Sequence, residues 1–479
     1  METIGLDNCK GPLPRLRHFG PRTDTFVTSD SARTPHAPQG QMLLCGGSND
    51  ASQGKTILSE LHGPHSVGLG IFGFFTTREA NVLRLVCKEM KSAIAEAEWN
   101  DMDTLIKNVP KWTACFPKAR SAYVNDLYDY GFDFSVEDHS LDVPEDHFRH
   151  FANVRKLCLK NMACSNKALR FLVNLREIEC INNINITDEG LASLPNLHSY
   201  KLDGNFSDAA FANKDFRHIK KMDLKHCRRV SIDLVRKLTN LTSLDVPGTC
   251  ISDDMLPNFR GIHTLRTSYA NIFSFHNLSG IHTLEVPNCD ITDESISFLS
   301  GIQNLDISGC QKIKGLTFVA LRNIKTLKAR DCRFKNNAIA HLAGIESLDI
   351  SRCYFVNDKS FKHLVGIKHL IAEDTFIADD GFQFLRGIHT LNISNCKCIS
   401  DKAFLHLQGI KTLIMMHASR RLTDKAFLNL AGIQHLCMDY TYAKRITGAH
   451  FSTMAGIKII SAYGCNNDVV SAALKLKRG

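Results

Sequence analysis

Apolar residues recur along most of the chain in a repeating unit. From residue 153 onward, each unit begins with a small or polar anchor residue, and apolar residues follow at the first, the fourth and usually the sixth position after it. Successive side chains of a strand point to opposite faces, so the fourth and sixth positions share one face. The pattern predicts one short, half-buried strand per unit. The fifteen anchors, spaced 19 to 24 residues apart, are Asn153, Asn174, Asn196, His218, Asn240, Gly261, Gly280, Gly301, Asn323, Gly344, Gly366, Gly387, Gly409, Gly432 and Gly456.

The second half of each unit has a helical pattern. Segments 187–194, 292–299 and 400–407 read TDEGLASL, TDESISFL and SDKAFLHL. Thr or Ser is a favoured helix N-cap, and Asp just inside the helix is stabilised by the positive end of the helix dipole. Apolar residues then follow three apart, as Phe404 and Leu407 do. Each unit is therefore predicted to be a strand followed by a short outer helix.

Cysteine marks the ninth position of seven units, at Cys227, Cys289, Cys310, Cys332, Cys353, Cys396 and Cys465. The resulting pattern L-x-x-L-x-L-x-x-C resembles the cysteine form of the leucine-rich repeat. A small, weakly hydrogen-bonding side chain fits there, where the chain turns into the core after the strand. Four of these cysteines fall in successive units, so we expect Cys289, Cys310, Cys332 and Cys353 to form a buried column of free thiols.

A unit with a single apolar face cannot bury that face alone, so neighbouring units stack and share one core. The sequence predicts an α/β fold, a leucine-rich-repeat solenoid (horseshoe) of about 15 repeats over residues 151–479. Segment 116–124 matches segment 151–159 in its apolar spacing. Residues 101–150 are therefore interpreted as a linker that contains an irregular first repeat.

The N-terminal part of the chain follows a different pattern. Residues 1–60 are rich in Gly, Pro, Ser, Thr and Asn without an apolar period, which predicts a disordered tail. Residues 61–100 predict a small helical module. Thr76 and Glu79 form a capping-box pattern, so a helix is expected to begin near residue 77, with Val82, Leu85 and Val86 on its apolar face.

This helical module resembles the F-box. Pro64, the pair Ile71 and Phe72, Phe75, the run Val86-Cys87-Lys88, and Trp99 match the family pattern, whereas Gly63, Gly68, Gly70 and Met90 depart from it. An F-box followed by cysteine-type repeats resembles the F-box/leucine-rich-repeat family. The resemblance implies that the module docks on a Skp-type adaptor and through it on a cullin ubiquitin ligase, while the repeats capture a protein substrate. The adaptor-binding residues it implies are Pro64, Ile71, Phe72, Phe75, Val86, Cys87 and Lys88.

The outward positions of the strands change character along the array. In early repeats they are charged, as at Lys156, Glu177 and Lys201. In late repeats they include apolar and aromatic residues, which in one patch usually mark a contact surface. We therefore expect the substrate on the concave face near the C-terminal end. The alternative is that the C-terminal segment folds back over the last repeats as a cap. The candidate substrate-binding residues are Ile371, Ile414, Met416, Tyr440 and Tyr463.

Composition excludes several classes of protein. The 479 residues carry a formal net charge of +9, spread along the chain, so no nucleic-acid partner is expected. No apolar stretch reaches the ~20 residues of a membrane span, and the N-terminus lacks the apolar core of a signal peptide. The 17 cysteines without a secretion signal predict a reducing, intracellular location in the cytoplasm or nucleus.

Two functions remain open at this point. No pair of cysteines has metal-ligand spacing, no nucleophile motif is present, and a solenoid offers an extended surface, so we expect no metal, no cofactor and no catalysis. The chain is then either the substrate receptor of a ubiquitin ligase or a non-ligase leucine-rich-repeat scaffold with a helical N-terminal cap.

Overall fold

The computed structural model describes residues 75–125, 143–162, 164–246, 251–441 and 444–478. The predicted tail over residues 1–60 and the expected adaptor contacts Pro64, Ile71 and Phe72 lie outside the described residues.

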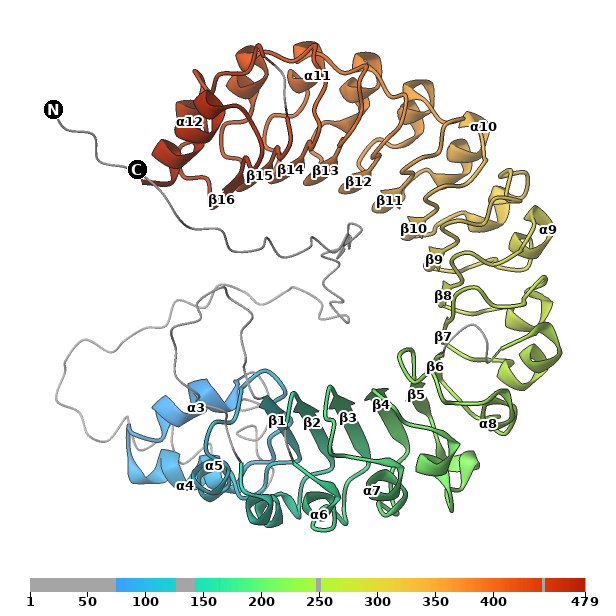
Figure 1. Cartoon of the computed structure of the whole chain (residues 1–479), viewed down its shortest axis with the longest axis vertical. Helices are drawn as coiled ribbons and strands as arrows, with labels where there is room; N and C mark the ends of the chain where they lie inside the picture. The colour runs from blue at the N-terminus through green and yellow to red at the C-terminus, as the bar shows by residue number, and fades with distance from the viewer. Residues whose placement is uncertain (1–74, 126–142, 163, 247–250, 442–443, 479) are drawn as a thin grey trace, which may run out of the picture. The chain divides into compact units, whose positions relative to one another are not determined.

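The fold is a leucine-rich-repeat solenoid built on one parallel sheet. Sixteen described strands pair in sequence order, each with the next. They line the inner side of the array, and the helical segments line the outer side (Figure 1). The strands are β1 (Ser121–Asn125), β2 (Lys156–Lys160), β3 (Glu177–Ile181), β4 (Ser199–Asp203), β5 (Lys221–Asp223), β6 (Ser243–Asp245), β7 (Thr264–Arg266), β8 (Thr283–Glu285), β9 (Asn304–Asp306), β10 (Thr326–Lys328), β11 (Ser347–Asp349), β12 (His369–Ile371), β13 (Thr390–Asn392), β14 (Thr412–Ile414), β15 (His435–Cys437) and β16 (Ile459–Ser461).

The sheet register confirms the predicted repeat alignment. The fourth position after each anchor pairs with the same position of the next repeat, as Leu327 does with Leu348, and these side chains are buried. The segment interpreted as an irregular first repeat contains β1, in which Ala122 pairs with Leu157 of β2. It raises the number of described strands to sixteen.

The outer segments begin where the capping pattern predicts, but many are 3₁₀ turns rather than α-helices. The side chains of Ser400 and Thr423 accept the expected N-cap hydrogen bonds, whereas those of Thr187 and Thr292 stand at the N-cap without one. A segment of three to seven residues contains little more than its two ends, where 3₁₀ bonds are common. The α segments are α6 (Asn166–Leu169), α7 (Asp188–Ala192), α8 (Ile232–Arg236), α9 (Asp293–Ile296), α10 (Asn336–Ile339) and α11 (Asp401–Phe404). The 3₁₀ segments are η1 (Glu145–Phe151), η2 (Asp208–Phe211), η3 (Phe216–His218), η5 (Asp253–Phe259), η6 (His276–Leu278), η7 (Phe318–Leu321), η8 (Ala340–Leu342), η9 (Asp358–His363), η10 (Asp379–Leu385), η11 (Asp424–Asn429) and η12 (Phe451–Met454).

The aspartate at the start of these segments joins neighbouring repeats. Asp401 accepts hydrogen bonds from the backbone N–H of Thr423, at 2.8 Å, and from its hydroxyl, at 2.6 Å. Asp379 holds Ser400 in the same way. Each carboxylate therefore satisfies the N-cap residue of the following repeat. From the sequence, Asp401 was expected to interact with the helix dipole of its own repeat, and this contact between repeats was not predicted.

The ninth-position cysteines form the predicted buried column. The thiols of Cys310, Cys332 and Cys353 donate to backbone carbonyls of the preceding repeat, at Val286, Ile307 and Ala329, over 3.0 to 3.3 Å. All the cysteines in the described part of the chain are free thiols. The column therefore bonds neighbouring repeats through thiol-to-backbone hydrogen bonds.

We expect Cys310 and Cys353 to resist alkylation in the folded protein. Burial raises the pKa of each thiol to about 12, so almost none of the reactive thiolate is present at neutral pH. The measurement is mass spectrometry after iodoacetamide treatment with and without urea. Exposed-site rates for these two thiols in the folded protein would contradict their burial.

The N-terminal module packs against the first strand. It consists of α3 (Thr77–Leu83), α4 (Lys88–Glu96) and α5 (Val109–Cys115). The capping box is present, and α3 begins at Thr77 as predicted. The helix ends at Leu83, sooner than the apolar pattern suggested, because Cys87 is extended and caps α4. A small core around Trp99 includes Ile94 and Phe116.

The C-terminal segment folds into α12 (Asn467–Arg478), which packs against β16 and η12. Val469 and Ala473 of α12 are buried in the core of the array. The C-terminal segment, considered as an alternative cap from the sequence, therefore packs on the end of the solenoid.

Candidate protein-binding surfaces

The helical module exposes an apolar surface that we call the α3–α4 patch, made of Val82, Leu85 and Val86. Leu85 is 86% exposed, Val86 is 69% exposed and Val82 is 64% exposed. The turn between α3 and α4 points these side chains away from the Trp99 core. Three large apolar side chains exposed together are typical of a contact surface.

The structure gives different positions to the other expected adaptor contacts. Phe75 is just over one third exposed, and Lys88 is exposed at the start of α4. Cys87 is half-buried, and its sulfur accepts a hydrogen bond from the backbone N–H of Met90 at 3.3 Å. Cys87 therefore has a structural role as the N-cap of α4.

The late repeats carry an aromatic cluster just after β14, β15 and β16. The ring of Tyr440 stacks on His417, with centroids 5.4 Å apart and planes 16° apart. Tyr463 meets the same tyrosine edge-on at 5.4 Å and is 70% exposed. Sequence analysis missed His417, although it occupies the eighth position of its repeat as Tyr440 does.

Backbone conformation at this cluster is unusual for large residues. Tyr440 has a φ of 54° and His417 a φ of 50°. The same left-handed turn occurs at the eighth position of most described repeats, for example at Asn288, Asp374 and Asn395, so it belongs to the repeat and not to this cluster alone. The turn places these rings at the rim of the concave face.

Ile414 and Met416 lie beside this cluster, whereas Ile371 lies apart from it. Ile414 is half-buried on β14, and Met416 follows that strand. Asn392 of β13 separates Ile414 from Ile371 of β12 in the register. The late-repeat patch therefore comprises Ile414, Met416, His417, Tyr440 and Tyr463.

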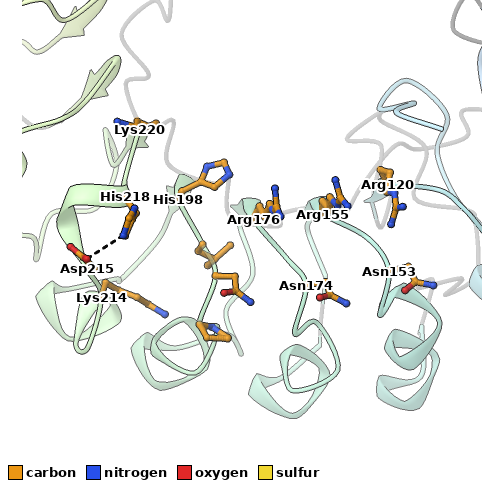
Figure 2. A pocket seen from close by; sticks show the side chains of 13 residues that line it. Arg120, Asn153, Arg155, Asn174, Arg176, His198, Lys214, Asp215, His218 and Lys220 are labelled. Atoms are coloured by element: carbon orange, nitrogen blue, oxygen red, sulfur yellow. Dashed lines mark ion pairs between the residues drawn. The ribbon is translucent and has the colours of Figure 1, made fainter. Parts of the chain in front are cut away.

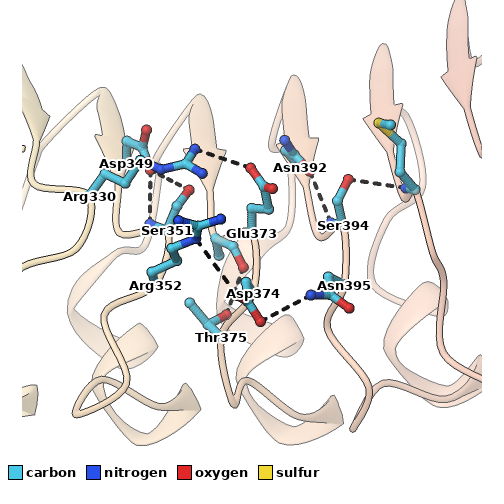
Figure 3. A network of polar contacts seen from close by, with 12 residues as sticks. Arg330, Asp349, Ser351, Arg352, Glu373, Asp374, Thr375, Asn392, Ser394 and Asn395 are labelled. Atoms are coloured by element: carbon cyan, nitrogen blue, oxygen red, sulfur yellow. Dashed lines mark hydrogen bonds and ion pairs between the residues drawn. The ribbon is translucent and has the colours of Figure 1, made fainter. Parts of the chain in front are cut away.

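A polar network borders the late-repeat patch on the side of the earlier strands (Figure 3). Arg330 pairs with Glu373 at 3.2 Å, and Arg352 lies 3.8 Å from Asp374. Asn395 donates to Asp374 at 3.1 Å. These contacts satisfy the charges around Ile371, so this residue belongs to a solvated, ion-paired face.

The C-terminal cap leaves the late-repeat patch open. Its helix α12 buries side chains against the end of the core, yet Tyr463 and Ile459 remain exposed. The cap and the exposed patch, weighed as alternatives from the sequence, are both present.

A half-buried acid, Asp245, lies on β6 in the middle of the array. Burial raises the pKa of the Asp245 carboxyl to about 7, and the neighbouring Asp223 carboxylate adds to the shift. Lys225 and Arg266 act in the opposite direction, and Glu285 pairs with Arg266 at 2.9 Å. The folded protein therefore holds a proton on Asp245 at a pH where the unfolded chain has lost it.

We expect Asp245→Asn to stabilise the protein at high pH. Between about pH 4 and pH 7 the folded state binds more protons than the unfolded state, so the free energy of unfolding falls as pH rises through that window. At pH 8 the free energy of unfolding of the variant should exceed that of the wild-type protein by about 1–2 kcal/mol. At pH 4 the two free energies should be nearly equal. Urea titrations at both pH values measure this, and an equal change at both would contradict it.

The described residues offer no other conventional site. No group of three or more His, Cys, Asp or Glu side chains within them is arranged to hold a metal ion. None of the helices in this part of the chain combines the length and apolar composition needed to cross a bilayer.

Comparison with known proteins gives a likeness of architecture. No protein-family model matches the chain, and no curated protein sequence matches it. An internalin from Listeria monocytogenes is similar over 66% of this chain and 88% of its own, with 17% identity and a TM-score of 0.45. The Rad7–Elc1 complex of yeast contains a chain that is similar over 65% of this chain and 83% of its own length, with 15% identity and a TM-score of 0.42. The Toll–Spätzle complex of Drosophila contains a chain that is similar over 76% of this chain and 53% of its own length, with 15% identity and a TM-score of 0.34.

Proposed function

We propose that the chain is the substrate-receptor subunit of a Skp–cullin–F-box-type ubiquitin ligase. The observation that carries the proposal is the α3–α4 patch, which overlaps the V-C-K end of the F-box-like motif. A module that served only as a cap would gain nothing from three exposed apolar side chains, since exposed apolar surface favours association.

The proposed division of labour follows from the two patches. The adaptor would bury Val82, Leu85 and Val86, and full burial of such side chains contributes about 1.5–3 kcal/mol each before the costs of association. The substrate would contact the late-repeat patch, where rigid tyrosines provide large contact areas at low entropic cost. The free thiols suit a reducing compartment, so we place the protein in the cytoplasm or nucleus.

A second function, a leucine-rich-repeat scaffold with a helical N-terminal cap, is favoured by a different observation. The backbone carbonyl of Trp99 accepts the N–H groups of Arg120 and Ser121, which is how each repeat holds the next. A bridge between Leu105 and Tyr123 extends the sheet beyond β1. The module therefore caps the array, and the two functions differ only in what binds the α3–α4 patch.

The double variant Leu85→Glu and Val86→Glu tests adaptor docking. We expect the tagged wild-type protein to recover a Skp-type adaptor and a cullin from eukaryotic cells and the variant to recover neither, because charges cannot enter an apolar interface without partners. Quantitative mass spectrometry of the purified complexes measures this.

Val365→Glu with Leu428→Glu is the matched control, since these exposed apolar residues lie on other parts of the array. The control should recover both proteins. Absence of adaptor and cullin from the wild-type sample would favour the scaffold function.

Met416→Glu tests substrate capture. We expect it to remove proteins bound at the late-repeat patch while adaptor and cullin recovery stays unchanged. The same purification measures both. A large fall in melting temperature would instead assign Met416 to the packing of the last repeats.

A further inference from the structure

A row of basic side chains precedes the first five strands. Arg120, Arg155, Arg176, His198 and Lys220 each stand one residue before a strand, in the same register. Neighbouring strands are about 4.8 Å apart, so the row spans about 20 Å. Figure 2 shows the five side chains along one edge of the array. Folding thus gathers charges that are 21 to 35 residues apart in the sequence.

The row differs from the strands beside it in its charge balance. On the strands, Lys156 lies 3.8 Å from Glu177, and Lys201 lies 3.5 Å from Glu179. Among the described residues, Arg155 and Arg176 form no ion pair with any carboxylate, and both are exposed. Arg120, at one end of the row, pairs with Glu98 at 2.7 Å. The excess positive charge of this edge therefore lies on Arg155, Arg176 and Lys220.

A groove of about 640 Å³ runs beside the row. Its lining includes Asn153 and Asn174 and a single acid, Asp215, which already pairs with Arg217 and His218. The Nδ1 atom of His198 is buried there without a hydrogen-bond partner among the described residues. The side-chain N–H groups of Asn174 and Asn196 already donate to the carbonyls of Ala152 and Val173, and Lys214 donates to backbone carbonyls. The charged donors left for a ligand in this groove are therefore chiefly those of Arg155 and Arg176.

We propose that this groove binds a phosphorylated segment of a protein partner. Arginine presents planar pairs of N–H groups that match phosphate oxygens, and a phosphate carries nearly two charges at neutral pH. Arg155 and Arg176 precede the neighbouring strands β2 and β3, so both guanidinium groups can donate to the same phosphate. Lys220 and His198 extend the positive field along the peptide.

The lining favours a phosphorylated protein over a nucleic acid. Proteins that hold single strands combine a basic groove with aromatic side chains on which bases stack. No Phe, Tyr or Trp lines this groove. The row also ends at β5, because Thr242 occupies the equivalent position before β6. The site therefore has the extent of a short peptide, and it does not depend on adaptor docking.

The test uses a fluorescein-labelled peptide pool with two fixed phosphoserines two residues apart and degenerate flanks without Lys or Arg. In an extended chain these phosphates lie about 7 Å apart, between the one-strand and two-strand spacings of the row. Fluorescence anisotropy with the full-length protein should show binding at least about tenfold tighter than for the same pool with unmodified serines.

Two variants and a control assign the binding. Arg155→Gln with Arg176→Gln should weaken phosphopeptide binding at least about tenfold. Arg155→Lys with Arg176→Lys should weaken it less, because lysine keeps the positive charge but lacks the paired N–H groups of the guanidinium. Lys411→Gln with Lys458→Gln removes the same charge at the same repeat position before β14 and β16, and should leave binding within about twofold. Circular dichroism checks that each variant is folded.

Three results would overturn the proposal. The first is equal binding of the phosphorylated and unmodified pools. The second is equal binding of a pool with glutamates in place of the phosphoserines, which would assign the groove to acidic segments. The third is arginine-dependent binding of a 12-nucleotide single-stranded DNA as tight as that of the phosphopeptides.

Discussion

Replacing Trp99 by alanine will detach the N-terminal module from the array. Trp99 is 2% exposed, its indole N–H donates to the carbonyl of Ile94 at 2.9 Å, and its ring meets Phe116 edge-on at 5.3 Å. Removal of a buried aromatic side chain costs about 3–5 kcal/mol. The small core around Trp99 has few other large residues with which to close the cavity.

Hydrogen exchange measures this effect region by region. Amides of α3, α4 and β1 should lose protection, whereas those of β10 to β16 should keep theirs, because each repeat contacts only its neighbours. Trp99→Phe keeps an aromatic ring but loses the indole hydrogen bond, so its effect should be smaller. Unchanged protection of β1 in the alanine variant would show that the first strand is stable without the module.

The second large effect is expected for Gly315→Ala. Gly315 has a φ of 79°, and a β-carbon there would lie 2.4 Å from the Cβ of Ala338 and 2.9 Å from the Cβ of Phe334 in the next repeat. Left-handed backbone costs a residue with a side chain about 1–2 kcal/mol, and overpacking adds about 1–3 kcal/mol. Urea unfolding should therefore show a loss of about 2–5 kcal/mol.

Gly344→Ala separates the two causes. Gly344 has a similar φ of 85°, but a β-carbon there would meet nothing within 4 Å. Its loss should be limited to the backbone cost of about 1–2 kcal/mol. An equal decrease in the free energy of unfolding for both variants would show that the close contact of Gly315 with the next repeat does not contribute to the loss.

The repeat architecture could be predicted because it depends on spacing within the sequence. The fourth position is apolar in all fifteen repeats and is buried in each of them, and Cys at the ninth position marks seven repeats. The capping residues Ser400 and Thr423 could also be predicted, since a cap is a local contact. The balance between α and 3₁₀ turns could not, because it follows from how little chain each repeat leaves for its outer segment.

Contacts between repeats were the main features that the sequence did not reveal. The aspartates that hold the next N-cap and the basic row before β1 to β5 both arise from side chains in different repeats. The distances between these side chains depend both on the register of the strands and on the conformation of the turns that follow them. Ile371 was grouped with the late-repeat patch by its position, yet Asn392 and the ion pairs of Arg330 and Arg352 set it apart. The candidate adaptor surface was anticipated at Val86, while Pro64, Ile71 and Phe72 lie outside the described residues.

The aspartate contacts give the array a polarity that bears on how it can be shortened. Asp401 serves the N-cap of the repeat that follows it, so at this contact a deletion from the C-terminal end leaves a carboxylate that water can solvate. Deletion from the N-terminal end instead removes the carboxylate that accepts hydrogen bonds from Thr423 or its counterparts. The N-terminal residue of that outer segment then loses its hydrogen-bond acceptor. Shortened forms of this protein should therefore retain the early repeats and lose late ones from within the array, with α12 kept to cover the apolar end of the core.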